Sequence, residues 1–268
     1  MGNQREYLIK NIVEISHKLH TMGWVANHDG NVTVKFEGAL LATPTAVSKA
    51  EIVPEMILTL DMEGKKVHGI GKPFSEISLH LAAYKAREDI GAVVHAHPPF
   101  AMARGLIGVG VDAGGDFEIL VPEAIVSIGD VIPAARYAFP GSVEHEQIIA
   151  EALSRCDVFM MAGNGVLSVG RDVNEAYLRM ELLEHLLKID YYAKSMGQVM
   201  AIPDEDRRKL LEKRAAAGLG PKGTHSSSPS PSPSPLQSSP SPGSPGHQKE
   251  LLKELIAEEL KKVLKEQK

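Results

Sequence analysis

The spacing of apolar residues divides most of the chain into helices and short strands. Residues 5–22 are predicted to be a helix, because one apolar stripe recurs at intervals of three and four residues: Tyr7, Leu8, Ile12, Ile15 and Leu19. Similar patterns predict helices at residues 76–87, 100–106, 144–152 and 174–195. Alternating or continuous apolar runs predict strands at residues 32–36, 39–43, 57–60, 65–68, 92–97, 124–128, 131–132, 157–162 and 166–169. Short strands among flanking helices are typical of an α/β layered domain, here with partly antiparallel strands.

Candidate chemistry gathers in one continuous stretch, from Glu76 to His97. Ser75 is predicted to be the N-cap of the helix that follows, which leaves Glu76 in its first turn. His95 and His97 lie two residues apart on a predicted strand, so both imidazoles leave the strand on the same face. Two neighbouring imidazoles are half of a metal site, and a nearby carboxylate such as Glu76 can act as a general base. The alternative interpretation is that the two histidines only end the sheet.

The composition changes after residue 220, which predicts a chain of three parts. Residues 221–247 are rich in Ser, Pro and Gly, so we expect a disordered linker that buries no core. Residues 248–268 carry a broad apolar face among Lys and Glu, which predicts an amphipathic helix detached from the domain at residues 1–220. An isolated helix of about 20 residues needs a partner, so we expect it to dock on other copies or on an unknown partner. Such a uniform extension is typical of an engineered fusion, and a natural oligomer-tethering tail is the alternative.

Charge and cysteine content exclude several classes of protein. The net charge of −5 gives no support to a nucleic-acid partner. Cys156 is the single cysteine, so no internal disulfide can form, which suits a reducing cytosol. No apolar run reaches the roughly 18 residues of a membrane span. We therefore expect a cytoplasmic protein that has neither nucleic acid nor a membrane as a partner.

The order of several short motifs resembles the class II aldolase/adducin-head family. The motifs are DGNVTVK, TPTA, KPFSEISLH, AVVHAHP and AGNGVLSVGRDVNEAYLRMELLEH. The resemblance implies a homotetramer of layered α/β/α single domains, each with a mixed, partly antiparallel sheet. It also implies a zinc ion, or another divalent metal, held by three histidines, two of which would be His95 and His97.

The function that the resemblance implies is reversible aldol cleavage of a small hydroxy-carbonyl compound, a sugar or sugar phosphate, by a metal-dependent lyase. Glu76 would be the acid and base for a metal-stabilised enediolate. The substrate phosphate would lie on loop positions that carry over to Gly30, Asn31, Thr45 and Ser75.

Three positions depart from the family pattern. Asn164, between Gly163 and Gly165, stands in the turn where the family has its third histidine, and an amide is a weak ligand for zinc. Ala46 replaces a glycine of the phosphate loop, and Phe74 replaces a serine. These changes leave two alternatives open. One is a catalytically silent scaffold used for oligomeric assembly, and the other is a related sugar-phosphate epimerase, dehydratase or decarboxylase.

Overall fold

The strands of the described residues, 2–107 and 116–221, pair into one large sheet and one small sheet in this computed structural model. The large sheet has eight strands, in the order β4 (Lys66–His68), β3 (Leu58–Leu60), β2 (Ala39–Ala42), β1 (Asn31–Phe36), β5 (Ala92–Ala96), β10 (Val166–Gly170), β9 (Val158–Met161) and β8 (Ala134–Ala135). Its pairs are antiparallel except for β8 and β9, which run parallel. The small sheet pairs β6 (Phe117–Glu118) with β7 (Val131–Ile132). The predicted mixed, partly antiparallel sheet is therefore confirmed.

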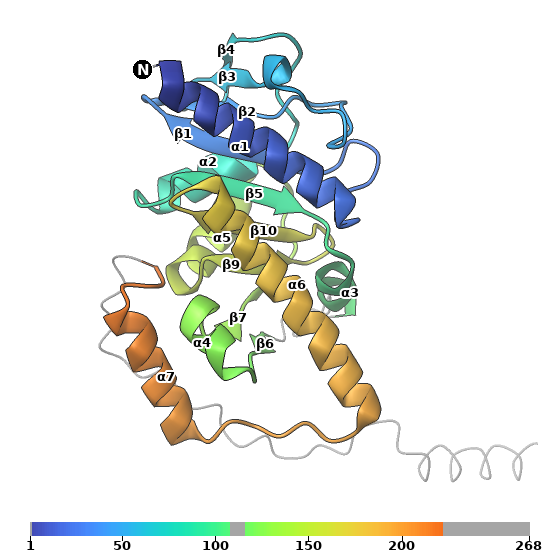
Figure 1. The fold of residues 1–268 in the computed structure, drawn as a ribbon, viewed down its shortest axis with the longest axis vertical. Helices are drawn as coiled ribbons and strands as arrows, with labels where there is room; N and C mark the ends of the chain where they lie inside the picture. The colour runs from blue at the N-terminus through green and yellow to red at the C-terminus, as the bar shows by residue number, and fades with distance from the viewer. Residues whose placement is uncertain (1, 108–115, 222–268) are drawn as a thin grey trace, which may run out of the picture. The chain divides into compact units, whose positions relative to one another are not determined.

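Helices cover both faces of the large sheet and make three layers (Figure 1). The helices of the described residues are α1 (Gly2–Thr21), the 3-10 helix η1 (Pro54–Met56), α2 (Ile77–Ala86), α3 (Pro99–Ile107), α4 (Pro122–Ile128), α5 (Val143–Arg155), α6 (Val173–Met196) and α7 (Asp204–Ala216). α1 and α6 lie along one face, whereas α2 and α5 pack against each other on the opposite face. The layered α/β/α fold is thus confirmed.

Alternation along β5 sends its side chains into two separate cores. Ala92, Val94 and Ala96 face the core of α1 and α6, whereas Val93 faces the core of α2 and α5. His95 comes two residues after Val93, so it lies on the α2 side of the sheet. Every residue of β5 is buried, which makes the strand a rigid internal support for this histidine.

The structure differs from the sequence prediction at a few short elements. Residues 124–128 are not a strand but part of α4, which begins at Pro122 and ends before Gly129. Proline fits the first turn of a helix, and Gly129 adopts the positive φ that suits a residue just beyond a helix, so these two signals outweigh the short apolar run. Ser75 is not the N-cap of α2, because Glu76 holds that position without a side-chain cap. The apolar pattern also misses η1, β6, β8 and α7.

Parts of the predicted chain lie outside the described residues. These are the linker from residue 222 to residue 247 and the amphipathic helix at residues 248–268. Within the described ranges, no helix combines the length and the apolar character that crossing a bilayer requires.

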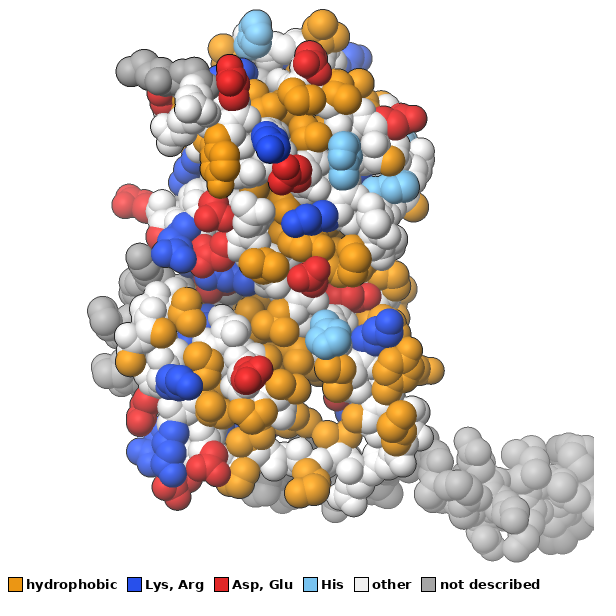
Figure 2. All heavy atoms as spheres, in the orientation of Figure 1, with side chains coloured by type: hydrophobic (Ala, Val, Ile, Leu, Met, Phe, Trp, Pro, Cys, Tyr) orange, Lys and Arg blue, Asp and Glu red, His pale blue; other side chains and the backbone are white. Residues whose placement is uncertain are grey.

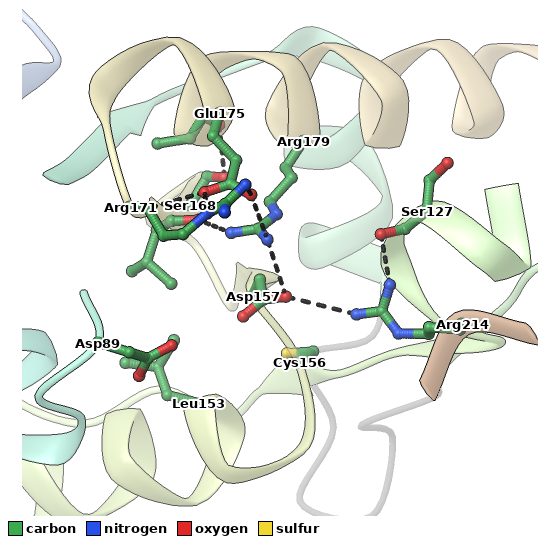
Figure 3. Close-up of polar contacts among 12 residues, drawn as sticks. Asp89, Ser127, Leu153, Cys156, Asp157, Ser168, Arg171, Glu175, Arg179 and Arg214 are labelled. Carbon is green, nitrogen blue, oxygen red and sulfur yellow. Dashed lines mark hydrogen bonds and ion pairs between the residues drawn. The ribbon is translucent and has the colours of Figure 1, made fainter. Parts of the chain in front are cut away.

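A fully buried carboxylate ties several parts of the domain together (Figure 3). Asp157, just before β9, forms ion pairs with three arginines. The nearest nitrogen-to-oxygen distance is 2.8 Å for Arg87, 3.3 Å for Arg179 of α6 and 3.4 Å for Arg214 of α7. Arg214 is the buried residue of α7, and it also donates to two carbonyl oxygens near the end of α4. Arg214 therefore helps to attach α7 to the core, together with Arg207, which forms ion pairs with Glu118 and Asp130.

Replacing Asp157 with asparagine should lower the free energy of unfolding by about 3–5 kcal/mol, because three arginines lose their shared counter-charge in a buried place. Urea unfolding at neutral pH measures the change. The matched carboxylate-to-amide control is Glu14→Gln, whose ion pair with Lys10 is exposed and spans 3.8 Å. The control should change the free energy by less than about 1 kcal/mol, and equal losses in both variants would contradict the role given to Asp157.

Candidate functional site

Pairing of three adjacent strands brings distant residues to one end of β5. β5 lies between β1 and β10, and the register places Asn31 and Leu167 opposite His95. Asn164 lies in the turn between β9 and β10. Glu76 comes directly before α2, the helix that covers this face of the sheet. The topology therefore gathers residues from four separate parts of the sequence.

The Glu76 carboxylate is the meeting point of these residues. Its Oε2 accepts a hydrogen bond from the amide nitrogen of Asn31 at 3.1 Å and lies 3.5 Å from Nε2 of His95. Its Oε1 accepts a hydrogen bond from the amide nitrogen of Asn164 at 3.1 Å. The Glu76 side chain is 29% exposed, so it is largely enclosed yet reachable from solvent.

The surroundings of Glu76 keep it ionised. Burial acts to raise the pKa of this carboxyl group, but contacts with His95, Asn164 and Asn31 outweigh burial and hold the pKa well below its usual range. An ionised carboxylate only accepts hydrogen bonds, so both asparagine amides must face it with their N–H groups. At neutral pH, Glu76 is therefore ready to accept a proton from a bound molecule.

The two histidines leave one ring nitrogen each without a hydrogen-bond partner. Their ring centroids are 5.1 Å apart, and both Nε2 atoms are buried with no hydrogen-bond partner in the described part of the chain. The other nitrogen of His95, Nδ1, lies 3.0 Å from the carbonyl oxygen of Val166. Nδ1 of His97 lies 3.8 Å from a carboxylate oxygen of Asp29. Metal-ligating histidines typically have an outer oxygen hydrogen-bonded to one nitrogen and the metal at the other, and the Val166 contact of His95 has this form, whereas the Asp29 contact of His97 is longer than a hydrogen bond.

These residues fit a divalent metal, although with a weaker donor set than three histidines. A buried polar atom without a partner is costly, and a metal ion would satisfy both Nε2 atoms. The third position holds Asn164, whose amide nitrogen is directed at Glu76. Within residues 2–107 and 116–221, no three His, Cys, Asp or Glu side chains are grouped so that they could hold a metal. Two imidazoles and an amide suit zinc less well than three imidazoles.

Two glycines let the neighbouring turns approach the histidines closely. At Gly165, where φ is 74°, a Cβ would lie only 2.5 Å from Cδ2 of His97 and 2.3 Å from the carbonyl oxygen of Ala96. At Gly30, where φ is 72°, a Cβ would lie 3.0 Å from the carbonyl oxygen of His95. Any larger residue at either position would push its turn away from the histidine pair.

Thr45 and Ser75, two of the predicted substrate-binding residues, lie on loops whose backbones are joined. The N–H of Thr45 donates to the carbonyl oxygen of Lys72 at 3.0 Å, and Pro44 pairs with Pro73 in an isolated bridge. Thr45 is half-buried and Ser75 is exposed, so neither is sealed in the core. The structure therefore brings these two loops together, but it records no direct contact of Thr45 or Ser75 with Glu76.

The two other departures from the family pattern have different structural settings. Ala46 has a φ of 58°, a left-handed conformation that glycine adopts with less strain. Phe74 is buried, and its ring lies 5.0 Å from the ring of His80 between centroids. The phenylalanine therefore covers a buried histidine directly behind Glu76.

The sequence prediction did not assign the residues behind Glu76 to the site. His80 and Tyr84 of α2 and Thr33 of β1 are all buried next to the site. Burial lowers the pKa of His80 to about 3, helped by the neighbouring His95 and opposed by the charge of Glu76, so the His80 ring is neutral. The spacing of four residues between His80 and Tyr84, just after Glu76, is the one signal that points to them.

A pocket opens beside Asn164 on the α5 side of the site. This side pocket has mostly apolar walls, which include Tyr137, His145, Ile149, Phe159, Met161 and Asn164. Burial lowers the pKa of His145, against the opposing charges of Glu76 and Glu146. Nδ1 of His145 accepts a hydrogen bond from the N–H of Gly141 at 3.4 Å, so the neutral ring carries its proton on Nε2.

A match between most of the domain and a known protein family identifies the family of this chain. Residues 10–191 match the family described as Class II Aldolase and Adducin N-terminal domain. The chain belongs to this family. Class II aldolases are generally dependent on a divalent metal, which agrees with the unpartnered nitrogens of the histidine pair.

Relatives match the class II aldolase domain over most of its length. The L-fuculose phosphate aldolase of Methanococcus maripaludis (strain C5) is 31% identical over 193 residues, which are 71% of this chain and 99% of that protein. A 3-oxo-tetronate 4-phosphate decarboxylase of Pectobacterium atrosepticum is 27% identical over 179 residues, 66% of this chain and 81% of that protein. A solved structure of an L-fuculose 1-phosphate aldolase has a TM-score of 0.68 at 25% identity, and the match covers 77% of this chain and 95% of that one.

Replacing Asn164 with histidine should strengthen metal binding by at least about tenfold, because a third imidazole replaces a weaker amide ligand. Competition with a zinc chelator measures the dissociation constant of the purified full chain and of the variant. Asn3→His, which adds an imidazole to the exposed start of α1, controls for non-specific zinc binding. Equal zinc affinity in the three proteins would contradict a metal position beside residue 164.

A buried lysine supports loops next to the histidines. Lys49 is 1% exposed, and its ammonium group donates to the carbonyl oxygens of His28 and Val47, each at 3.3 Å. It thereby ties the loop that carries Thr45 to the turn that carries Asp29. Burial lowers the pKa of Lys49 to about 8, although the charge of Asp29 acts to raise it.

The lowered pKa of Lys49 should make the free energy of unfolding rise with pH between about 8 and 10.5. In this window the unfolded chain, whose lysine has the ordinary pKa of 10.5, binds a proton that the folded protein has released. Below about pH 8 both states are protonated, so this contribution to the slope disappears. Urea unfolding of the wild type and Lys49→Met across this window measures the slope, and Lys10→Met controls for the loss of one charge. The prediction fails if Lys49→Met keeps the wild-type slope.

Proposed function

We propose that the chain is a divalent-metal-dependent lyase of the class II aldolase type, which cleaves a small sugar or sugar phosphate by a reversible aldol reaction. The observation that supports this most is an ionised Glu76 carboxylate beside two buried imidazole nitrogens that lack hydrogen-bond partners. Aldol chemistry needs a group that moves a proton and an electrophile that polarises a carbonyl group. The family match over residues 10–191 supports the same class of reaction.

In this proposal His95 and His97, together with the amide of Asn164, hold the metal. A bound divalent metal supplies Lewis-acid polarisation of the substrate carbonyl. The carbonyl oxygen of Val166 holds Nδ1 of His95, which keeps that ring in one orientation with Nε2 turned towards Glu76. Because one ligand is an amide, we expect weaker metal binding than in a site of three histidines.

Glu76 moves the proton in this mechanism. In the cleavage direction a proton leaves the hydroxyl group whose carbon becomes the aldehyde, and a proton is added to the carbon on the other side of the broken bond. Glu76 can accept a proton and return it, while the N–H groups of Asn31 and Asn164 hold its two oxygens in place. Glu76 Oε2 lies 3.5 Å from Nε2 of His95, so a carbonyl group polarised by a metal on the histidine pair would lie within reach of this base.

The loops around the site suit a phosphorylated substrate, and we place the phosphate on Gly30, Asn31, Thr45 and Ser75. Backbone N–H groups and hydroxyl groups of such loops can hold a phosphate without a basic patch. The names of the Methanococcus and Pectobacterium relatives both specify phosphorylated compounds, which supports this choice. The carbon atoms beyond the cleaved bond would extend past Asn164 into the side pocket, whose apolar walls suit a short, weakly polar end.

A catalytically silent scaffold is the second candidate, and Asn164 favours it. The amide stands in the third ligand position and forms a hydrogen bond with the proposed base. Within the enzyme class, a sugar-phosphate epimerase, dehydratase or decarboxylase is a further candidate. The name of the Pectobacterium relative supports the decarboxylase among these.

We extend the proposal to a cytoplasmic homotetramer with a tethered tail. Exposed apolar side chains gather at the C-terminal end of α6, where Tyr191, Tyr192 and Met196 are 61%, 47% and 84% exposed. Figure 2 shows hydrophobic side chains over the lower part of this face, and large exposed patches of this kind mark contact surfaces. The proposed parts of the chain are the domain at residues 1–220, a linker at 221–247 and a docking helix at 248–268.

The Glu76→Gln variant should cleave its substrate about 10²–10⁴-fold more slowly in kcat, because an amide cannot accept the proton. The assay follows aldehyde release from L-fuculose 1-phosphate and carbon dioxide release from 3-oxo-tetronate 4-phosphate, using the full chain loaded with zinc or manganese. Glu14→Gln is the matched control, since Glu14 is exposed on α1.

The three outcomes of this assay separate the candidates. Aldehyde release that depends on both metal and Glu76 supports the aldolase, whereas carbon dioxide release supports the decarboxylase. No turnover by the wild type or by Asn164→His, with either metal, would contradict the enzyme proposal on these substrates and favour the silent scaffold.

A further inference from the structure

We propose that Tyr84, Thr33, His80 and Asn31 form a one-way cascade of hydrogen bonds that holds the Glu76 carboxylate in a single orientation. In this proposal the four are positioning residues, which act on the reaction through Glu76. The cascade crosses repeatedly between two elements: Tyr84 and His80 belong to α2, Thr33 and Asn31 belong to β1, and Glu76 precedes α2. Its consequence for catalysis rests on the proposed function, whereas its geometry stands independently of it.

Each link of the cascade is a short contact between side chains. The hydroxyl oxygens of Tyr84 and Thr33 are 2.9 Å apart, and Thr33 Oγ1 lies 2.7 Å from Nδ1 of His80. Nε2 of His80 lies 2.6 Å from Oδ1 of Asn31. The amide nitrogen of Asn31 then lies 3.1 Å from Oε2 of Glu76.

The charge of Glu76 determines the direction of every link. A carboxylate only accepts, so Asn31 presents its N–H group to Glu76 and its oxygen to His80. The oxygen requires a donor, so neutral His80 carries its proton on Nε2 and accepts at Nδ1. Thr33 must then donate to Nδ1, which leaves its oxygen to accept from the hydroxyl group of Tyr84. One arrangement of protons satisfies all four links.

Burial protects this arrangement from competing water. His80 and Thr33 have no exposed surface, and Asn31 and Tyr84 are also buried. The ring of Phe74 covers His80, with 5.0 Å between the ring centroids. A reversed link would place two donors or two lone pairs against each other in a dry place, which is costly. Each residue therefore restricts the orientation of the next, and the last restricted group is Glu76.

The first test reads the position of the His80 proton in the full chain. Long-range proton–nitrogen correlation spectra of protein labelled with ¹⁵N-histidine distinguish the two neutral tautomers and the imidazolium form, and the signal missing from His80→Gln identifies His80. We expect His80 to be fully protonated on Nε2 alone. Glu76→Gln, which removes the charge that orients the Asn31 amide, should convert this single form into a mixture, whereas Thr33→Val should keep it, because the Asn31 oxygen still requires a donor at Nε2. A ring protonated on Nδ1, or a tautomer indifferent to Glu76→Gln, would overturn the cascade.

The second test asks whether the cascade acts through Glu76 during turnover. Thr33→Val should lower kcat about tenfold with less than about a twofold change in KM, comparable to the loss of outer partners at other sites. Tyr84→Phe, which removes only the first donor, should have a smaller effect in the same direction, and Thr33→Ser should recover most of the activity. Ser168→Ala removes another buried hydroxyl group of the same sheet, one that donates to Ala176, and should leave kcat unchanged.

The two tests fail in distinguishable ways. A wild type without turnover that still carries the Nε2 proton on His80 would count against the proposed aldolase and leave the cascade supported by its tautomer. An active wild type whose kcat falls equally in Thr33→Val and Ser168→Ala would overturn the positioning role. If Thr33→Val does not fold, Tyr84→Phe provides the same comparison, because removing its hydroxyl group leaves the ring in place.

Discussion

The antiparallel register of β1, β5 and β10 is the constraint on which the rest of the site depends. It places Asn31 and Leu167 opposite His95, and it brings the turn that carries Asn164 to the same end of β5. A slip of one residue along β5 would turn His95 into the core of α1 and α6 and expose Val94 to the α2 side. Such a slip would cost much of the free energy of folding, because β5 is buried on both faces and every residue would move from one core to the other. The same strand register is therefore required both for the stability of the layered fold and for the geometry of the site.

Neutral donors, not cations, surround the carboxylate of the site. Two amides bind Glu76, and a neutral histidine lies behind one of them. The domain places its buried arginines elsewhere, around Asp157, where the opposite charges compensate each other. Glu76 therefore stays ionised without a salt bridge to an arginine. Its carboxylate remains available as a base.

The sequence is most informative where one local pattern is sufficient. The periodicity of α1 and α6, the Gly163–Gly165 hairpin and the His95–Ala96–His97 pair can all be found from short stretches. Residues 124–128 mislead, because a short apolar run suits strand and helix equally, and only Pro122 and Gly129 decide for α4. The links from Thr33 to His80 and from Asn31 to Glu76 join residues more than 40 positions apart. Such contacts depend on how α2 packs on β1, and no spacing within either element reveals them.

Asn164 shows why the fold and the activity of this domain must be considered separately. Its backbone N–H closes the turn on the carbonyl oxygen of Met161 at 3.0 Å, and its amide binds Glu76, so the residue satisfies both its turn and the carboxylate. A histidine in its place would offer a stronger metal ligand but one fewer amide donor to Glu76. The asparagine thus leaves the carboxylate well held, whereas a metal bound beside it would have two imidazoles and only a weaker amide as ligands. How well the domain is built and how tightly its site could hold an ion are therefore separate properties.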